Sequence, residues 1–271
     1  MSVSICIPTF KGEAYIAETI QSVIDQSYQE IEIIVLDDAA SADTEAICKS
    51  FEDDRVLYFA NSQRLGPKGN WDKCIKMAAG TYFKLLPHDD ILLPRALERQ
   101  SHILQTRQDV ALVFGARQIL NPNGSPMMER KPLGDMARSI DGFELVRKTI
   151  RTGNNIIGEP GNGLIRTELA KHLAHYDDSY PYTIDLNFWF RALAFGNAYY
   201  TAEFESAFRV HNESWSAELA RSQYHDFVAT AETFAKDPVY AIDRKTLRIG
   251  RYKAKFNTYA RRVIFKLNAK S

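Results

Sequence analysis

The chain lacks the features that mark disulfide-stabilised, membrane-spanning and secreted proteins. It has only three cysteines, Cys6, Cys48 and Cys74, without paired spacing, so we expect buried free thiols in a reducing compartment. No apolar run reaches the roughly 18 residues that a membrane-spanning helix needs. The start, MSVSICIPTF, has no basic segment followed by a long apolar stretch. We therefore expect no secretory signal and a cytoplasmic protein.

Two chemical signatures are also missing. The first predicted strand runs into PTFKGEAY, which lacks the Gly-x-Gly-x-x-Gly turn that brings backbone close to a pyrophosphate. A dinucleotide-dependent oxidoreductase is therefore a weak alternative. None of the cysteines is placed as a nucleophile. Internal repeats and low-complexity segments are absent from the 271 residues, of which 45% are hydrophobic, so we expect one compact unit.

The formal net charge of zero conceals an uneven distribution. From residue 244 to 271 there are ten basic residues and no acidic one: Arg244, Lys245, Arg248, Arg251, Lys253, Lys255, Arg261, Arg262, Lys266 and Lys270. The rest of the chain has 24 basic against 34 acidic residues. A basic end on an acidic body predicts contact with an anionic membrane surface, phosphates or an acidic partner chain, and a solvated helical tail is the alternative. We expect no nucleic-acid partner.

Strands and helices are predicted to alternate up to about residue 120. Continuous Val/Ile/Leu runs or strand-like patterns occur at 2–7, 31–36, 56–60, 81–86 and 110–116. Helical patterns lie between them, at 14–28, from an N-cap at Ser41 to Phe51, from a cap at Asn70 to Gly80, and from Pro94. This alternation predicts an α/β fold with a mostly parallel central sheet and helices on both faces.

The pattern changes after Asn121. Residues 127–138 show no period, whereas 139–150, 167–175 and 185–195 look helical and 197–210 look extended. The last sixty residues are predicted to be helical. We expect one domain at 1–215, with halves at 1–120 and 121–215, and a basic helical C-terminal extension at 216–271.

Acidic pairs follow two of the predicted strands. Asp37-Asp38 ends the second strand, and Asp89-Asp90 follows the fourth through Pro87-His88. Open α/β sheets bind ligands outside the carboxyl ends of their strands. Carboxylates there accept hydrogen bonds from a nucleobase or ribose, or hold Mg²⁺ or Mn²⁺ together with substrate phosphates. Helix capping is the structural alternative for each pair.

Three other side chains extend this set. Lys68, in the loop RLGPKGN, would add positive charge for a phosphate, although an exposed loop lysine commonly serves solubility. Asp185 lies where an aromatic segment becomes a helix, and apolar walls raise the proton affinity of a carboxylate, which suits a general base. An N-cap is the alternative for Asp185. His211, in FRVHNESWS, is either a ligand or a structural histidine.

Together these segments resemble the family 2 glycosyltransferases, inverting enzymes of the GT-A fold. The likeness begins with SICIPTF (4–10), IQSVIDQSY (20–28), EIIVLDD (32–38) and LGPKGNW (65–71), and then runs from AGTY (79–82) to Asp89-Asp90. Weaker matches are GEP (158–160), Asp185 with Trp189 and Arg191, and FRVH (208–211). The resemblance covers about residues 2–215.

The resemblance implies a role for each matching position. Pro8, Thr9 and Phe10 would line the nucleotide pocket, and Asp38, with Asp37, would recognise the base. Asp89 would bind a divalent metal, Mn²⁺ or Mg²⁺, with His211 completing the site and Asp90 near the donor sugar. Asp185 would be the catalytic base, and the acceptor would lie near Gly158, Glu159 and Pro160.

Three positions depart from the family pattern. Pro87 replaces the first Asp of the usual DxD motif, Ala39-Ala40-Ser41 replaces the usual glycine and serine, and Ile184 replaces an acid before the catalytic Asp. The sequence predicts a metal-assisted inverting glycosyltransferase that moves a sugar from a nucleotide-diphosphate donor to a hydroxyl of a glycan or lipid-linked saccharide in polysaccharide biosynthesis. The alternative is a non-catalytic nucleotide- or glycan-binding module on the same fold.

Overall fold

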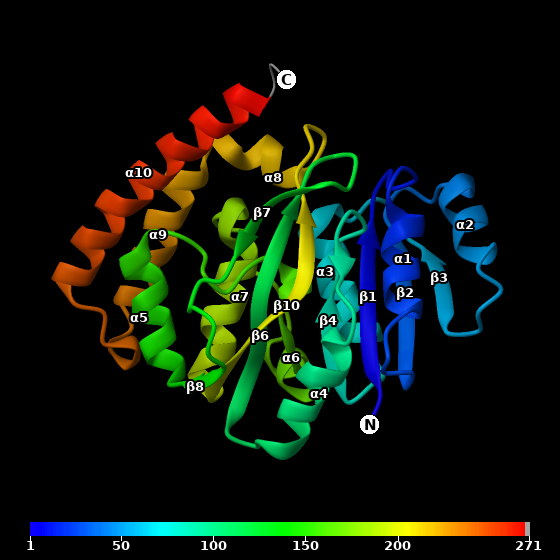
Figure 1. Ribbon diagram of the computed structural model, residues 1–271, viewed down its shortest axis with the longest axis horizontal. Helices are drawn as coiled ribbons and strands as arrows, with labels where there is room; N and C mark the ends of the chain where they lie inside the picture. The colour runs from blue at the N-terminus through cyan, green and yellow to red at the C-terminus, as the bar shows by residue number, and fades with distance from the viewer. Residues whose placement is uncertain (269–271) are drawn as a thin grey trace.

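A mixed sheet with helices on both faces forms the centre of the computed structural model, which describes residues 1–268 and the side chains of residues 1–259 (Figure 1). Its strands are β1 (Val3–Thr9), β2 (Ile31–Asp37), β3 (Val56–Ala60), β4 (Tyr82–Leu85), β5 (Ile91–Leu92), β6 (Val110–Leu120), β7 (Pro126–Arg130), β8 (Arg138–Ile140), β9 (Leu164–Arg166) and β10 (Asn197–Arg209). Its α-helices are α1 (Ile16–Ile24), α2 (Ala42–Lys49), α3 (Gly66–Met77), α4 (Ala96–Thr106), α5 (Gly142–Thr152), α6 (Thr167–Leu173), α7 (Ile184–Ala192), α8 (Trp215–Glu218), α9 (Gln223–Ala235) and α10 (Arg244–Asn268).

The strand order is β3-β2-β1-β4-β9-β6-β10-β5, with β7 paired to β6 and β8 to β10. Strands β1 to β4 run parallel to their neighbours among themselves, and so do β6 and β10. The short strand β9 joins these two groups by antiparallel pairing with β4 and β6. The predicted α/β fold with a largely parallel sheet and C-terminal helices is thus confirmed.

Burial explains the continuous apolar runs of the central strands. Every residue of β1 is buried, because helices cover both faces of the sheet (Figure 1). The stripe of α1 that contributes Ile16, Ile20 and Val23 packs into the same core cluster as the alternate residues of β1 and β2. The core therefore fixes the strand ends that carry the acidic pairs.

Several predicted element boundaries were wrong. Helix α3 begins at Gly66 rather than at Asn70, whose side chain instead donates to Leu36 O at 2.9 Å inside the fold. The predicted helix from Ser139 begins only at Gly142, because residues 138–140 pair with β10. The segment predicted to be irregular contains β7, which forms a hairpin with β6. In each case tertiary pairing overrides the local pattern.

The C-terminal part is helical, as predicted. Helix α10 packs along α5 and α9 on one side of the molecule (Figure 1). No helix among the described residues is both long and apolar enough to cross a membrane. Lys270 of the basic end lies outside the described residues, as do the side chains of Arg261, Arg262 and Lys266. The predicted division at residue 215 stays a prediction.

Candidate active site

The parallel strands β1, β2 and β4 deliver their carboxyl ends to one edge of the sheet. Thr9 and Asp37 are register partners there, and Asp38 N donates to Thr9 O at 2.9 Å. Leu86 N, just after β4, donates to Cys6 O at 2.8 Å, which carries the PHDD segment to the same edge. Parallel pairing thus brings together acidic residues that are about 50 positions apart in the sequence.

The two carboxylates after β2 are both engaged by the chain itself. Asp37 accepts hydrogen bonds from Ala39 N and Ser41 N, each at 2.8 Å, and from the Tyr58 hydroxyl at 2.9 Å. It therefore shapes the turn in which Ser41, as predicted, caps α2.

Asp38 accepts from Leu65 N at 2.7 Å, Gly66 N at 2.8 Å and the Asn61 side-chain amide at 2.8 Å. The Asp38 carboxylate thus ties the end of β2 to the start of α3. A ligand that donates a hydrogen bond to Asp38 would compete with these three donors.

Thr9, Phe10 and Gly12 lie at and just after the end of β1, next to the strand end that carries these carboxylates. Phe10 carries the Arg64 guanidinium over its ring, 4.1 Å from the centroid. The hydroxyl of Thr9 is buried and has no hydrogen-bond partner among the residues that the structure describes. A Cβ atom at Gly12 would lie 2.3 Å from Thr9 Oγ1 and 2.6 Å from His88 Cδ2, so this close packing needs glycine. A buried hydroxyl without a partner is suited to a hydrogen bond with a polar ligand.

Lys68 is paired within the protein. Its Nζ lies 2.6 Å from a carboxylate oxygen of Asp72, one turn further along α3. The other oxygen of Asp72 accepts from Tyr176 N at 2.6 Å. In this state Lys68 belongs to a network that joins α3 to the segment before α7.

Asp89 and His211 meet across the site. His211 Nε2 lies 2.9 Å from Asp89 Oδ2, although the two residues are 122 positions apart in the chain. Burial raises the pKa of Asp89, but the hydrogen bond with His211 and the nearby His88 outweigh it, so the pKa lies below its usual range. The His211 ring also packs 4.9 Å from that of Tyr15.

Arg209 and Thr19 fix the acidic pair in place. The buried Arg209 donates from Nε to Asp89 O at 3.1 Å, and from its backbone N to Asp90 Oδ1 at 3.2 Å. Thr19 Oγ1 donates to both His88 O and Asp90 O, at 2.7 and 2.8 Å. Strand β10 and helix α1 therefore hold the PHDD turn from two sides.

Glu159 links the acidic pair to the other half of the site. Its carboxylate lies 2.7 Å from Arg117 Nε on β6. Burial and the charges of Asp89 and Glu159 raise the pKa of Asp90 well above its usual range. Burial and the charge of Glu159 likewise raise the pKa of Asp185, to about 7. One glutamate is thus close enough to act on carboxylates from both halves of the chain.

Asp185 is held in the first turn of α7. Its Oδ2 accepts from the Asn155 side-chain amide at 3.0 Å, and its Oδ1 from Leu186 N at 2.7 Å. Trp189, on the same helix, donates to Gly158 O at 3.3 Å, which ties α7 to the GEP segment. Asn155 and Arg117 also line a cavity of about 250 Å³ together with residues 129–132.

A buried lysine beneath the site was not foreseen. Lys84 of β4 is fully buried, and its Nζ donates to Gly161 O at 2.9 Å and Gly163 O at 2.8 Å. These carbonyls follow Glu159 and Pro160, so Lys84 anchors the turn that carries Glu159. Burial lowers the Lys84 pKa to about 7. A charged residue inside a buried strand pattern was the sequence signal.

The side chains that could hold a metal ion fit an ion whose remaining ligands come from substrate phosphates. Among the residues that the structure describes, no three His, Cys, Asp or Glu side chains are grouped closely enough to hold a metal ion. Asp89 and His211 provide one oxygen and one nitrogen at hydrogen-bond distance. Ions such as Mn²⁺ accept such ligands, and Mg²⁺ commonly keeps one or two carboxylates plus substrate phosphates.

Comparisons with known proteins identify the family. The sequence profile of glycosyl transferase family 2 matches residues 4–174. A glycosyltransferase of Rickettsia typhi is 30% identical over 239 residues, which is 86% of this chain and 71% of that protein. A GalNAc(5)-diNAcBac-PP-undecaprenol beta-1,3-glucosyltransferase of Campylobacter jejuni is 35% identical over 116 residues, 41% of this chain and 37% of that protein.

Solved structures share the fold at low identity. TarS of S. aureus in complex with UDP-GlcNAc has a TM-score of 0.68 and 18% identity, covering 87% of this chain and 66% of that chain. The mannosyltransferase PcManGT of Pyrobaculum calidifontis, in complex with GDP-Man and Mn²⁺, has a TM-score of 0.61 and 14% identity, covering 93% and 69%. Some curated relatives are much longer, since the chain spans only 31% of a Rickettsia bellii glycosyltransferase.

The profile matches more than half of the chain, and the Rickettsia typhi relative is similar over most of both sequences. The chain therefore belongs to glycosyl transferase family 2, which confirms both the resemblance and the predicted glycosyltransferase class.

Proposed function

We propose that this protein is an inverting glycosyltransferase that moves a sugar from a nucleoside-diphosphate donor to a hydroxyl of a glycan or lipid-linked saccharide. One observation carries the proposal. The turn at residues 158–161 reaches both groups of carboxylates. A Cβ atom at Gly161 would lie 3.8 Å from Asp90 Oδ2, and the Asn155 amide donates both to Gly158 O and to Asp185 Oδ2. In-line sugar transfer needs a donor site and a base close together.

The donor would occupy the edge formed by β1, β2 and β4. In this proposal Pro8, Thr9 and Phe10 line the nucleotide pocket, which fits the unpaired Thr9 hydroxyl. Asp38 would recognise the base by exchanging an internal donor for a ring N–H, with Asp37 shaping the turn. Lys68 would reach the phosphates only after leaving Asp72. Relatives support the donor class, since their structures hold UDP-GlcNAc or GDP-Man.

Asp89 and His211 would hold a divalent metal, Mn²⁺ or Mg²⁺, and PcManGT was solved with Mn²⁺. When bound, such an ion neutralises negative charge on a diphosphate leaving group. Arg209 and Thr19 keep Asp89 and Asp90 in position for this task. Asp90, whose Oδ1 accepts from Arg209 N, would lie near the donor sugar.

Asp185 would act as the general base. The acceptor oxygen attacks the anomeric carbon opposite the diphosphate, so the new C–O bond forms as the bond to the phosphate oxygen breaks. The hydroxyl proton passes to the Asp185 carboxylate, and the configuration inverts. A pKa of about 7 suits proton uptake near neutral pH.

The acceptor would lie near Gly158, Glu159 and Pro160 and in the cavity lined by Arg117 and Asn155. The name of the Campylobacter jejuni relative specifies an undecaprenol-linked acceptor, which supports a lipid-carried acceptor here. We further propose that the basic residues from 244 onward bring the protein to an anionic membrane surface, such as the cytoplasmic leaflet, where polysaccharide precursors would be extended.

Thermal-shift screening tests the donor site. UDP, GDP, UDP-GlcNAc and GDP-mannose would be compared with and without Mn²⁺, and release of nucleoside diphosphate from the same sugars would be followed. We expect one nucleotide to stabilise the protein more with Mn²⁺ and its sugar to be turned over. Binding without any turnover would instead favour a non-catalytic module. Pro87, which stands in place of the first Asp of the usual DxD motif, would be consistent with that result. No stabilisation by any nucleotide would contradict the proposal.

A further inference from the structure

Helix α10 presents a stripe of exposed aromatic side chains. Tyr252, Phe256 and Tyr259 are 77%, 65% and 69% exposed. Their spacing of four and three residues places them on one face of the helix, because each residue advances about 100° around the axis. Large exposed aromatics grouped on one face mark an interaction surface, whereas scattered ones need no explanation.

The opposite face fixes how this stripe is oriented. Gly250, Ala254 and Thr258 are buried, and a Cβ atom at Gly250 would lie 2.3 Å from Ile150 O of α5. Asn257 donates to the carbonyls at the end of α5, at 3.2 and 3.1 Å.

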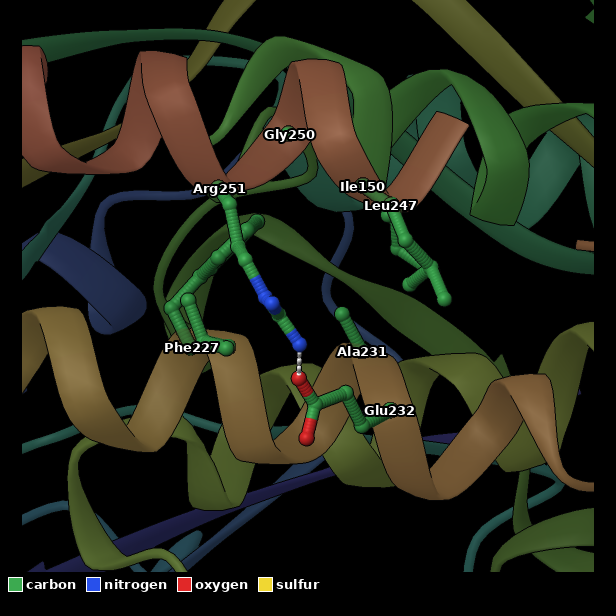
Figure 2. Close-up of a pocket in the computed structure, with 8 residues that line it drawn as sticks. Ile150, Phe227, Ala231, Glu232, Leu247, Gly250 and Arg251 are labelled. Carbon is green, nitrogen blue, oxygen red and sulfur yellow. Dashed lines mark hydrogen bonds and ion pairs between the residues drawn. The ribbon is translucent and has the colours of Figure 1, made fainter. Parts of the chain in front are cut away.

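The neighbouring helix α9 adds an ion pair between Glu232 and Arg251, and Leu247 lines the narrow space between α10 and α9 (Figure 2). Contacts with α5 and α9 therefore fix the orientation of α10, and its aromatic stripe faces away from the rest of the protein.

Basic side chains flank the stripe. Lys245, Arg248, Lys253 and Lys255 are exposed, and no acidic residue occurs from 244 to 271. Tyrosine and phenylalanine beside lysine and arginine are typical of a helix that lies in the headgroup region of a bilayer. A second copy of the same face would instead bring like charges together.

We propose that Tyr252, Phe256 and Tyr259 insert into the headgroup region of an anionic membrane while the flanking lysines and arginines contact its phosphates. This inference deepens the membrane contact proposed above and rests on it, but it does not depend on the transfer reaction.

The placement of α10 relative to the site supports this surface. In Figure 1 the helix rises along one side, and its C-terminal end lies at the end of the molecule where β1 and β10 also end. That edge carries Thr9 and the Asp89–His211 pair. A protein docked through α10 would thus hold its candidate active site close to a lipid-carried acceptor.

Vesicle co-sedimentation of the full chain tests the proposal. The probes are vesicles of phosphatidylcholine alone and of phosphatidylcholine with 30% phosphatidylglycerol. We expect the wild type to bind the anionic vesicles more strongly, and less so as NaCl rises. Replacing the three aromatics together (Tyr252→Ser, Phe256→Ser, Tyr259→Ser) should weaken anionic binding at least about tenfold. Arg248→Gln with Lys255→Gln should weaken it about fivefold per residue.

Matched controls separate insertion from a general loss of structure. Met136→Ser with Phe195→Ser removes side chains that are 74% and 57% exposed elsewhere, and should leave binding unchanged. Tm and nucleotide-sugar hydrolysis in solution should be equal for all variants, so a failure of the proposed reaction would show separately.

Three results would overturn the inference: wild-type binding by the aromatic variant, equal binding of the wild type to neutral and anionic vesicles, and aromatic-dependent dimerisation in sedimentation velocity without vesicles.

Discussion

Glu159→Gln should shift the pH dependence of turnover toward acid. The pKa of Asp185 rises from 3.8 to about 7, first through burial and then through the charge of Glu159, whereas Arg117 opposes the rise. Only about a tenth of this carboxyl is ionised at pH 6, so a reaction that uses it as base should gain rate with pH up to about 7. The substitution removes the Glu159 charge and frees Arg117, and both changes lower the Asp185 pKa.

The pKa of Asp185 in Glu159→Gln should stay above its unperturbed value, because the carboxyl remains buried. The midpoint of the acid limb in kcat should therefore fall below 7 but stay above 3.8. Stability gives a second measure. Between about pH 4 and 7, Asp185 stays protonated in the folded protein but is ionised in the unfolded chain. The free energy of unfolding therefore falls by up to about 4 kcal/mol as pH rises through this window. Glu159→Gln should restore part of this lost stability at pH 8 and none of it at pH 4.

The assay follows release of nucleoside diphosphate from the active donor between pH 4.5 and 9, with Tm measured in parallel. Glu168→Gln, an equal charge change at an exposed position of α6, is the control and should leave the profile in place. An acid limb that stays at the same pH in Glu159→Gln would refute the electrostatic link between Glu159 and Asp185.

Three further substitutions probe other parts of the site. Lys84→Met removes a lysine whose pKa in the folded protein, about 7, lies below its usual 10.5. In urea unfolding, the stability of the wild type relative to the variant should therefore rise by about 1.4 kcal/mol per pH unit between pH 7 and 10. A difference that stays constant over this range would argue against a depressed pKa. His211→Ala should raise the Mn²⁺ concentration for half-maximal turnover at least about tenfold, and an unchanged Mn²⁺ requirement would remove His211 from the metal site. Gly12→Ala places a methyl group against Thr9 and His88, and should cost about 1–3 kcal/mol of stability and weaken nucleotide binding in calorimetry. Wild-type affinity would show that no nucleotide binds beside Thr9.

Local patterns predicted the first half of the fold because its strands are buried on both faces. Continuous apolar runs marked β1 and β2 within one or two residues, and Ser41 was correctly identified as the cap of α2. The predictions failed where pairing partners are distant. Strand β8 forms only because it pairs with β10, about 60 residues later, and no local period signals this.

The candidate acidic residues could be named from the sequence, but the side chains that hold them in place could not. Asp89 and His211 were linked only by resemblance, whereas the structure places them 2.9 Å apart. The roles of Arg117, Asn155 and Arg209 depend on contacts between segments from 30 to 120 residues apart. Such contacts are set by strand order, which single-sequence patterns do not contain.

Turnover and donor binding by Asp185→Asn, measured side by side, test most directly whether one cleft holds both the donor and the base. Calorimetry would follow binding of the active nucleotide sugar with Mn²⁺, and nucleotide release in the presence of acceptor would follow transfer. The account predicts transfer reduced about 10²- to 10⁴-fold with donor affinity within about twofold of wild type. Transfer by Asp185→Asn at the wild-type rate would contradict it.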